Sequence, residues 1–542
     1  MLSLATKMRH FSTKTEKLFG KELHDFVYSN TPYRAKNFID GEWRDFKKSD
    51  KDAIIPDPLT GEHMFSVSPI DDKSREDLIH SWAKCNKSGL HNPMKHPQRY
   101  REWGEVIFKA AEKFHDPEVY DFIYRIMHKC MPKSDTQLRN EILVTRQFLD
   151  NFSGDNPRFT IKGFVVPGDG NDQQSIGYRF PYGPVAIISP FNFPLEIPVL
   201  QTVGALITGN KPLLKPDIRT GPVTEAFIRL LENCGMPRDS LLYLNANGGD
   251  TERVLRQGSD ILRLIQFTGS SRIAERLLHV FKGKVKIEDS GFNWKILGPD
   301  VKQFDYVVSQ CDQDSYAVSG QKCSAQRILF VHENWKNANF FEKFKERVQT
   351  RKLENFTSVP LLSVTNDMFK RHLDMLLKIP GAGLLWGGHE LKNHSIPSVY
   401  GYYEPTAVYV PLEAFTEKTY LNFLLQEIFG PLLIVTEYDS SKIETVKKVM
   451  ESMHFHLTSG ITSNDIFFIN DILRHTVNGV TYAGLKARTT GAPQNHFFGP
   501  GGDPRGSGIG TPDAIINTWT YHREVVYDFS AKDVNVAALK QS

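Results

Sequence analysis

Cysteine is scarce in this sequence, and its spacing suggests neither a metal site nor a disulfide framework. Only 5 of the 542 residues are cysteines: Cys85, Cys130, Cys234, Cys311 and Cys323. Their number is odd and no two form a Cys-x-x-Cys pair, which argues against a zinc site and a set of disulfide bonds. We therefore expect reduced thiols, a reducing compartment and no metal ligands.

The sequence also lacks an uninterrupted apolar run long enough to span a membrane. Its longest apolar stretch, residues 182–207, contains the polar side chains of Asn192, Glu196 and Gln201. Prolines interrupt this stretch at Pro184, Pro190, Pro194 and Pro198. Because a spanning helix needs about 20 predominantly apolar residues, the stretch is predicted to be buried core.

A large excess of either charge is missing as well. The formal net charge at pH 7 is +3, which gives no electrostatic basis for binding nucleic acid or a membrane surface. Hydrophobic residues at 40% and charged residues at 24% are typical of a globular protein, and the length suffices for two large domains. A small metabolite is therefore the better candidate partner.

Strand and helix patterns alternate through the middle of the chain. Apolar runs predict strands at 185–189, 212–215, 241–244, 262–267 and 285–287, with helices at 194–208, 222–234, 251–256 and 271–281. After Glu288 a second series has predicted strands at 295–297 and 327–331 and helices at 306–319 and 340–347. Such repeated units predict an α/β fold with parallel sheets covered on both faces.

The remaining segments differ from this alternation. Residues 36–70 predict a small antiparallel arrangement, and the runs at 74–87, 98–114, 118–129 and 140–151 predict helices. Residues 159–166 and 175–180 predict a pair of strands, and residues 524–529 predict a late strand. The chain therefore contains a helical region before the first α/β series and additional strands outside both.

Cys323 is the cysteine whose neighbouring residues favour a role as a nucleophile. It lies in Gly320-Gln321-Lys322-Cys323-Ser324-Ala325, where small and polar residues would let another molecule approach the thiol. Taken alone it could still be a small buried hydrophobic residue. Motifs elsewhere supply groups that a thiolate reaction needs: Glu288 in Lys286-Ile287-Glu288-Asp289, Asn192 in Pro190-Phe191-Asn192-Phe193-Pro194, and Glu427 in Glu427-Ile428-Phe429-Gly430-Pro431.

Together these motifs resemble those of the aldehyde dehydrogenase superfamily. The resemblance extends from Asn37-Phe38-Ile39-Asp40-Gly41-Glu42-Trp43 through Phe267-Thr268-Gly269-Ser270 to the glycine-rich run at 501–510. It implies a parallel-sheet NAD-binding domain over 16–154 and 181–288 and an α/β catalytic domain over 289–485. It also implies a small oligomerisation β-flap from 155–180 and 515–542, and hence a homo-oligomer.

The resemblance implies roles for three catalytic residues. Cys323 would be the nucleophile, Asn192 and the backbone N–H of Cys323 would bind the oxyanion, and Glu288 would activate water for thioester hydrolysis. The family usually has Glu-Leu-Gly-Gly-Lys around the catalytic base. Here Asp289 follows Glu288, and a second acid at this position is expected to change the pKa of Glu288, most simply by raising it. Without the resemblance, Asn192 could be a turn residue and Glu288–Asp289 a solvated acidic pair.

The implied cofactor is NAD. The resemblance assigns the adenosine ribose to Lys215, the pyrophosphate to Gly269 and Ser270, and the nicotinamide ribose to Glu427. Further cofactor-binding residues by the same resemblance are Ser189, Pro190, Phe191 and Phe429. The acid that usually follows the lysine by three positions is Ile218 here, flanked by Asp217 and Arg219, so NADP stays open as an alternative.

The substrate is expected to carry a carboxylate. Residues 489–495 resemble the loop with which Δ1-pyrroline-5-carboxylate dehydrogenases bind the substrate's α-carboxylate through backbone N–H groups, here those of Gly491 and Ala492. Ser324 would assist, and the rings of Phe193 and Phe498 would clamp the aliphatic chain. The alternative is an ordinary glycine-containing surface turn.

Within the family the motifs are most similar to the plant-like branch of these mitochondrial enzymes. That similarity implies NAD-dependent oxidation of L-glutamate 5-semialdehyde, the open form of Δ1-pyrroline-5-carboxylate, to L-glutamate in proline catabolism, through a cysteine thiohemiacetal and thioester. The alternatives are a dehydrogenase for another semialdehyde, such as succinate semialdehyde, and a catalytically silent family member with a structural role.

The first fifteen residues contain basic and hydroxyl side chains and no acid. This composition is typical of a mitochondrial transit segment, and Arg9-His10-Phe11-Ser12 is similar to a matrix-peptidase cleavage sequence. A merely basic tail is the alternative. The expected location is the mitochondrial matrix.

Overall fold

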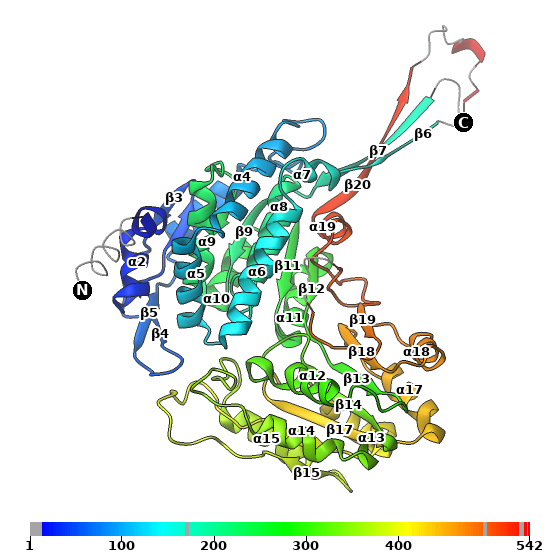
Figure 1. Ribbon diagram of the computed structural model, residues 1–542. Coiled ribbons are helices and arrows are strands. Elements are labelled where there is room, and N and C mark those ends of the chain that lie inside the picture. Colours follow the sequence, from blue (N-terminus) through cyan, green and yellow to red (C-terminus); the bar gives the residue numbers. More distant parts are fainter. Residues whose placement is uncertain (1–13, 168–172, 492–495, 530–535, 539, 542) are drawn as a thin grey trace.

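The structure is a computed structural model that describes residues 14–167, 173–491, 496–529, 536–538 and 540–541. Two large sheets organise it, and a narrow three-stranded sheet projects from the body (Figure 1). A further small sheet near the N-terminus joins β1 (Tyr33–Arg34), β5 (His63–Val67) and β4 (Ala53–Pro56).

The first large sheet has seven strands in the order β12-β11-β8-β9-β10-β2-β3. Their bounds are Val285–Glu288, Leu264–Thr268, Pro184–Ile188, Lys211–Lys215, Leu242–Tyr243, Asn37–Ile39 and Glu42–Arg44. The five strands from β12 to β10 are parallel, and β2 and β3 extend the sheet in antiparallel fashion. The parallel strands are almost entirely buried, as expected for a sheet with helices on both faces.

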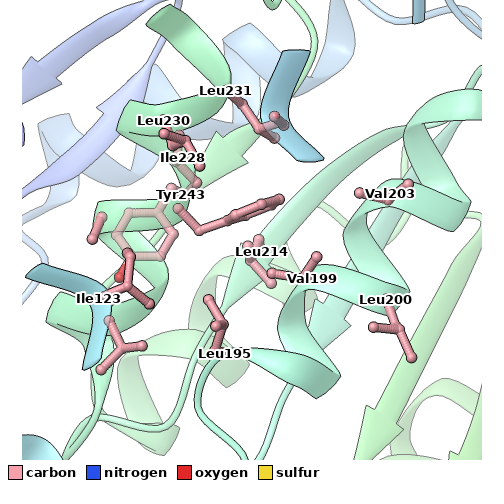
Figure 2. Packing of buried hydrophobic residues seen from close by; sticks show 14 of the residues in the cluster. Ile123, Leu195, Val199, Leu200, Val203, Leu214, Ile228, Leu230, Leu231 and Tyr243 are labelled. Carbon is pink, nitrogen blue, oxygen red and sulfur yellow. The ribbon is translucent and has the colours of Figure 1, made fainter. Parts of the chain in front are cut away.

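Successive residues of these strands enter different cores. Leu213 packs in a cluster with Leu242, whereas Leu214 packs in another with Tyr243, because side chains alternate between the faces of a strand. On the Leu214 side, the core includes residues of α5 (Pro117–Cys130), α8 (Glu196–Ile207) and α9 (Gly221–Asn233) (Figure 2). On the other side it includes residues of α3 (Asp72–Ala83), α10 (Gly248–Gln257) and α11 (Ser271–Phe281).

Other helices also surround the first sheet. They are α2 (Lys21–Tyr28), α4 (Arg99–Lys113) and α6 (Asp135–Asn151). Residues of all three contribute to the same core as Leu214. The prolines of residues 182–207 fit this arrangement, because Pro184 begins a strand and Pro198 lies in the first turn of α8.

The second large sheet has the order β15-β16-β17-β14-β13-β18-β19. Its strands are Gly383–Trp386, Thr406–Tyr409, Leu432–Tyr438, Gln326–His332, Asn293–Leu297, Thr458–Thr462 and Val480–Ala483, and β15 alone among them is antiparallel to its neighbour. Its described helices are α12 (Phe304–Tyr316), α13 (Glu333–Asn337), α14 (Phe340–Val348), α15 (Asn366–Leu376), α16 (Lys418–Leu424), α17 (Ile443–Glu451) and α18 (Ile466–Leu473). The predicted α/β class is confirmed.

The projecting sheet is antiparallel and has the order β20-β7-β6. It consists of β20 (Thr520–Asp528), β7 (Gln173–Pro181) and β6 (Phe164–Pro167), and extends away from both large sheets (Figure 1). The helices α7 (Asn156–Phe159) and α19 (Pro512–Trp519) lead into it. We call these three strands the flap.

Two predicted elements differ from the structure. Phe159 ends a short helix and does not begin a strand. The strands described within residues 36–70 pair antiparallel as predicted, β2 with β3 and β4 with β5, and the parallel pairing of β5 is with β1, which precedes that range. The helix predicted over 306–319 ends at Tyr316, because Val318 and Ser319 have positive φ angles that an α-helix cannot contain. The last difference places an irregular loop next to Cys323.

Candidate active site

A cavity of about 1170 Å³ lies at the carboxyl ends of the first sheet's parallel strands. Ser189 follows β8, Lys215 ends β9, Gly269 follows β11 and Glu288 ends β12, so the topology gathers them at one edge, where open α/β sheets bind ligands. All the predicted catalytic and cofactor-binding residues line this cavity: Ser189, Pro190, Phe191, Asn192, Lys215, Gly269, Ser270, Glu288, Cys323, Glu427 and Phe429.

Residues 317–325, the nucleophile loop, have a strained backbone just before Cys323. The φ angles of Val318, Ser319 and Gly320 are 56°, 50° and 70°. A β-branched residue such as Val318 rarely adopts this conformation, which costs on the order of 1–3 kcal/mol and persists only where the surroundings enforce it. A side chain at Gly320 is also excluded, because a Cβ there would lie 2.2 Å from the carbonyl oxygen of Gly430.

The buried side chain of Gln321 fixes the loop to residues 359–362. Its Nε2 donates to the carbonyls of Val318 at 3.1 Å and Pro360 at 2.9 Å, and its Oε1 accepts from the backbone N–H of Leu362 at 2.9 Å. The backbone carbonyl of Gln321 accepts from Asn192 Nδ2 at 3.2 Å. The predicted oxyanion donor is therefore oriented by the nucleophile loop itself.

Asn293, at the start of β13, holds the other side of Cys323. Its Nδ2 donates to the carbonyls of Cys323 at 2.7 Å and Ala325 at 2.8 Å. Gly291 lets the chain approach, since a Cβ at that position would lie 2.1 Å from the Cys323 carbonyl oxygen. The backbone on both sides of the thiol is thus fixed by buried amides.

Arg327 joins the nucleophile loop to the segment that contains Glu427. Its guanidinium is buried and donates to the carbonyls of Gly320 at 2.7 Å and Gly430 at 2.9 Å. It also pairs with the Glu427 carboxylate at 3.3 Å. Burial raises the pKa of Glu427 to about 7 even though Arg327 opposes this shift.

Cys323 and Glu288 lie close enough for each to shift the pKa of the other. Burial and the neighbouring carboxylate raise the pKa of the Cys323 thiol, so the thiol is neutral at pH 7. Burial raises the pKa of Glu288 to about 7, and within the described chain neither of its carboxylate oxygens has a hydrogen-bond partner at ordinary geometry. An unpartnered buried carboxyl group with a pKa near 7 is suited to proton transfer.

Asp289 is a second buried acid beside Glu288. Burial raises the pKa of Asp289 to about 6. Its charge raises the pKa of Glu288 further, although less than burial does. The direction agrees with the prediction that an adjacent acid raises the pKa of Glu288.

A pair of charged residues lies where the cavity borders β9. Arg219 donates from Nε and Nη2 to the Asp217 carboxylate, both at 2.7 Å, and from Nη1 to the Leu362 carbonyl. Its guanidinium lies 4.3 Å over the ring of Phe191. Burial favours the neutral acid, but Arg219 outweighs it and lowers the pKa of Asp217 to about 2.

The residues predicted to bind substrate are placed apart from the cavity lining. Phe193 is half-buried, with Lys133 Nζ at 4.3 Å from its ring centroid, and Ser324 is buried beside Cys323. Phe498 is buried in the core of the first sheet. Gly491 is described, whereas Ala492 lies outside the described residues.

Several residues that shape this site carry no signal in the sequence. Asn293 precedes the predicted strand 295–297, Arg327 begins the predicted strand 327–331, and Leu362 lies far along the chain from the nucleophile loop. No local pattern distinguishes them, because their partners are distant in sequence. Among the described residues no group of histidine, cysteine and acidic side chains could hold a metal ion, and no helix is long and apolar enough to cross a membrane.

Comparisons with known proteins match this geometry. Residues 46–524 match the aldehyde dehydrogenase family. The chain is 50% identical over 500 residues to "Delta-1-pyrroline-5-carboxylate dehydrogenase 12A1, mitochondrial" of Arabidopsis thaliana, which covers 92% of this chain and 89% of the relative. It is also 50% identical over 497 residues to a "Probable aldehyde dehydrogenase" of Linum usitatissimum, with the same coverage of both chains.

Solved structures show the same fold at lower identity. Aldehyde dehydrogenase 21 from Physcomitrella patens, in complex with the reaction product succinate, has a TM-score of 0.77 at 22% identity, covering 94% of this chain and 100% of that one. Apo betaine aldehyde dehydrogenase from Staphylococcus aureus has a TM-score of 0.78 at 19% identity, with 94% and 97% coverage. The predicted aldehyde dehydrogenase-like fold is confirmed. The family match and the half-identical relatives show that the chain belongs to the aldehyde dehydrogenase family and is an aldehyde dehydrogenase.

Proposed function

We propose that this protein oxidises L-glutamate 5-semialdehyde to L-glutamate with NAD, as a step of proline catabolism. The observation that carries the substrate assignment is the 50% identity, over most of both chains, to an Arabidopsis protein named for Δ1-pyrroline-5-carboxylate. The proximity of Cys323 and Glu288 in one cavity supports the chemistry.

Cys323 begins the reaction as nucleophile. Its sulfur bonds to the aldehyde carbon, the carbonyl electron pair moves to oxygen, and the thiol proton passes to the neighbouring Glu288 carboxylate. Asn192 and the backbone N–H of Cys323 bind the oxygen of this thiohemiacetal. The bond from Asn192 to the Gln321 carbonyl fixes the amide in advance, so little reorganisation is needed when charge develops.

Glu288 then serves the hydrolysis of the thioester. After releasing the first proton to solvent, its carboxylate takes a proton from water, whose oxygen attacks the thioester carbon. The carbon–sulfur bond breaks, and sulfur recovers a proton from Glu288. A pKa of about 7 lets this group both accept and return a proton near neutral pH.

The cavity fits a dinucleotide. Ser270 and Ser271 line it at the start of α11, Ser270 makes no side-chain capping bond, and a Cβ at Gly269 would lie 2.6 Å from the ring of Phe267. An uncapped helix start of this kind suits the pyrophosphate, Lys215 suits the adenosine ribose and Glu427 the nicotinamide ribose. NAD held by these residues would supply the hydride acceptor for oxidation of the thiohemiacetal to the thioester.

Asp217 and Arg219 support NAD over NADP. The guanidinium of Arg219 is engaged by Asp217, the Leu362 carbonyl and the ring of Phe191. It is therefore not free to pair with a 2′-phosphate, and the ionised Asp217 would repel one. This pair compensates for Ile218, which stands where the family usually has an acid.

The substrate's carboxylate is assigned to Gly491, Ala492 and Ser324. A Cβ at Gly491 would lie 1.6 Å from the Tyr482 hydroxyl oxygen, so a side chain there would displace Tyr482. A backbone without a side chain leaves the N–H open to a carboxylate, and Ser324 directly follows the nucleophile. Phe193 and Phe498 are assigned to the aliphatic chain.

The flap supports assembly into a homo-oligomer. Phe164, Val165, Val166 and Val526 are large apolar residues of the flap that remain exposed, with exposed fractions from 43% to 63%. Such surface on a projecting sheet favours burial against a second copy of the chain. The mitochondrial matrix is proposed as the location from the composition of residues 1–15, of which 1–13 lie outside the described residues.

One assay tests this function. NAD and NADP reduction would be measured with glutamate semialdehyde, succinate semialdehyde and acetaldehyde as substrates. The proposal predicts the highest kcat/KM for glutamate semialdehyde with NAD. A higher value for succinate semialdehyde would reassign the substrate, and no turnover with any aldehyde would indicate a silent family member.

A further inference from the structure

A buried ion pair lies between the nucleophile loop and the segment that contains Gly491. Lys295 of β13 and Asp314 of α12 pair at 2.6 Å, and both side chains are fully buried. The Asp314 carboxylate accepts three further hydrogen bonds, from Gln310 Nε2 at 2.9 Å, the backbone N–H of Thr489 at 3.0 Å and Thr490 Oγ1 at 3.0 Å. Two of its partners are therefore the residues directly before Gly491, and we call residues 489–491 the anchor segment.

The pair contributes little to stability by charge alone. The desolvation free energy of a buried carboxylate and ammonium is about as large as their electrostatic attraction. A buried ion pair is therefore stabilising only when further hydrogen bonds satisfy the two groups. Burial lowers the pKa of Lys295, but Asp314 outweighs it and holds that pKa above its ordinary value. Asp314 also accepts hydrogen bonds from Thr489 and Thr490, and these bonds fix the anchor segment.

The position of Asp314 in the chain connects this segment to the nucleophile. Asp314 lies in the last turn of α12, which ends at Tyr316, and the nucleophile loop begins at the next residue. The same helix end therefore holds the anchor segment through Asp314 and leads into Cys323. The end of α12 therefore connects the segment where the carboxylate would bind to the loop where the aldehyde would bind.

We propose that Asp314, held by Lys295, is a positioning residue that fixes the anchor segment for the substrate's carboxylate and so selects a carboxylated semialdehyde. This inference rests on the proposed function, because it assigns the carboxylate to the anchor segment. Asp314 acts through Thr489 and Thr490 and does not itself touch the substrate, since an anionic side chain would repel a carboxylate.

The test compares two aldehydes in each variant. The measured quantity is kcat/KM for glutamate semialdehyde divided by kcat/KM for propanal, which has no carboxylate. Asp314→Asn, which changes the charge but not the shape, should lower this ratio by on the order of tenfold or more, with the loss in KM for glutamate semialdehyde. The kcat/KM for propanal should stay within about twofold of the original value, because propanal has no carboxylate and therefore does not depend on the anchor segment.

Thr490→Val is the milder variant, and it keeps the ion pair intact. It removes only the bond from Thr490 Oγ1 to Asp314, so the ratio should fall by roughly twofold to tenfold. Thr490→Ser retains the hydroxyl and should restore the ratio. Should Asp314→Asn fail to fold, these two variants decide the proposal.

Asp312→Asn is the matched control. Asp312 is a buried acid on the same helix, and it pairs with Arg351 at 2.7 Å and Arg347 at 3.7 Å. Its loss should lower the melting temperature but leave the ratio unchanged. An equal fall in the ratio for Asp312→Asn and Asp314→Asn would mean that any damage to α12 has this effect, and would overturn the proposal.

Two other outcomes separate this inference from the proposed function. If the unmodified enzyme prefers glutamate semialdehyde but Asp314→Asn and Thr490→Val keep its full ratio, the positioning role is wrong and the proposed function stands. If the unmodified enzyme does not prefer glutamate semialdehyde to propanal, the carboxylate assignment is wrong, and the positioning role fails with it.

Discussion

Cys323 and Glu288 lie side by side, but the protein holds them in opposite ways. The loop around Cys323 is fixed by the buried side chains of Gln321, Asn293 and Arg327, which bind its backbone on both sides. The Glu288 carboxylate is equally buried, yet within the described chain its oxygens have no hydrogen-bond partner at ordinary geometry. The nucleophile is thus positioned through its backbone. The Glu288 carboxylate lies beside the Cys323 thiol, which lowers its pKa less than burial raises it.

The difference matches what each group has to do. A nucleophile gains most from a fixed attack geometry, because misplacement by about 1 Å can cost about a hundredfold in rate. A base gains most from a pKa near the working pH, and hydrogen bonds to its carboxylate would lower that pKa. The strained backbone at Val318 and Ser319 is part of the loop that fixes the attack geometry. The lack of hydrogen bonds from buried amides of the described residues to the Glu288 carboxylate keeps its pKa near the working pH.

The largest effect is expected from Cys323→Ala. Without the sulfur no thiohemiacetal forms, so turnover should fall by on the order of 10⁴-fold or more. Calorimetry should still detect NAD binding, because the thiol adds little to the cofactor site. Cys234→Ala, which removes a buried thiol at the end of α9, is the control and should retain turnover. Unchanged turnover in Cys323→Ala would end the nucleophile assignment.

Glu288→Gln should separate the two half-reactions. One equivalent of NADH should still form in a first phase, slower than in the unmodified enzyme because Glu288 no longer accepts the thiol proton. Steady-state turnover should fall further, by roughly 10²–10⁴-fold, since hydrolysis of the thioester lacks its base. Mass spectrometry of the quenched enzyme should detect the acyl group on Cys323.

The pH profile gives an independent check on the same residue. Burial raises the pKa of Glu288 to about 7, so the carboxylate fraction, and with it the hydrolysis rate, should rise as pH increases through 7. Glu288→Gln should lose this rise. An unchanged steady-state rate would mean that Asp289 or another group is the base.

The sequence predicted more of the fold than of the contacts that hold the site together. The strands from β8 to β12 have short apolar runs, and their order along the chain is enough to place Ser189, Lys215, Gly269 and Glu288 at one edge. The proximity of Cys323, Asn192 and Glu288 was predicted from the family resemblance, and the structure brings the three to one cavity. Their roles stay predictions.

The contacts that fix the nucleophile loop could not be predicted. Gln321 binds residues 359–362, and Arg327 binds Gly430, pairings between segments far apart in sequence that no local pattern reveals. The left-handed conformation of Val318 contradicts its intrinsic preference, so the helix was predicted to continue to Ser319. Tertiary packing overrides the local preference at this loop.

Gln321→Leu tests whether the fixed loop matters. Leucine has a similar volume but leaves the Val318 and Pro360 carbonyls and the Leu362 N–H unpaired, at about 1–3 kcal/mol each. We expect a lower melting temperature and a fall in kcat of roughly tenfold to a hundredfold through misplacement of Cys323. Gln349→Leu, at the exposed C-cap position directly after α14, should change neither. Normal kcat in Gln321→Leu would show that the loop's bonds are not needed for catalysis.

The smallest effect is expected from Asp289→Asn, which changes only the charge beside the base. Burial is the main cause of the raised pKa of Glu288, and the Asp289 charge adds to it. Because the pKa of Asp289 is about 6, this acid is mostly ionised at pH 7. Removing the charge should therefore shift the midpoint of the steady-state pH profile to lower pH, by less than about one unit. Asp503→Asn, which removes a charge paired with Arg505, should shift it less. A shift to higher pH would contradict the assignment of this midpoint to Glu288.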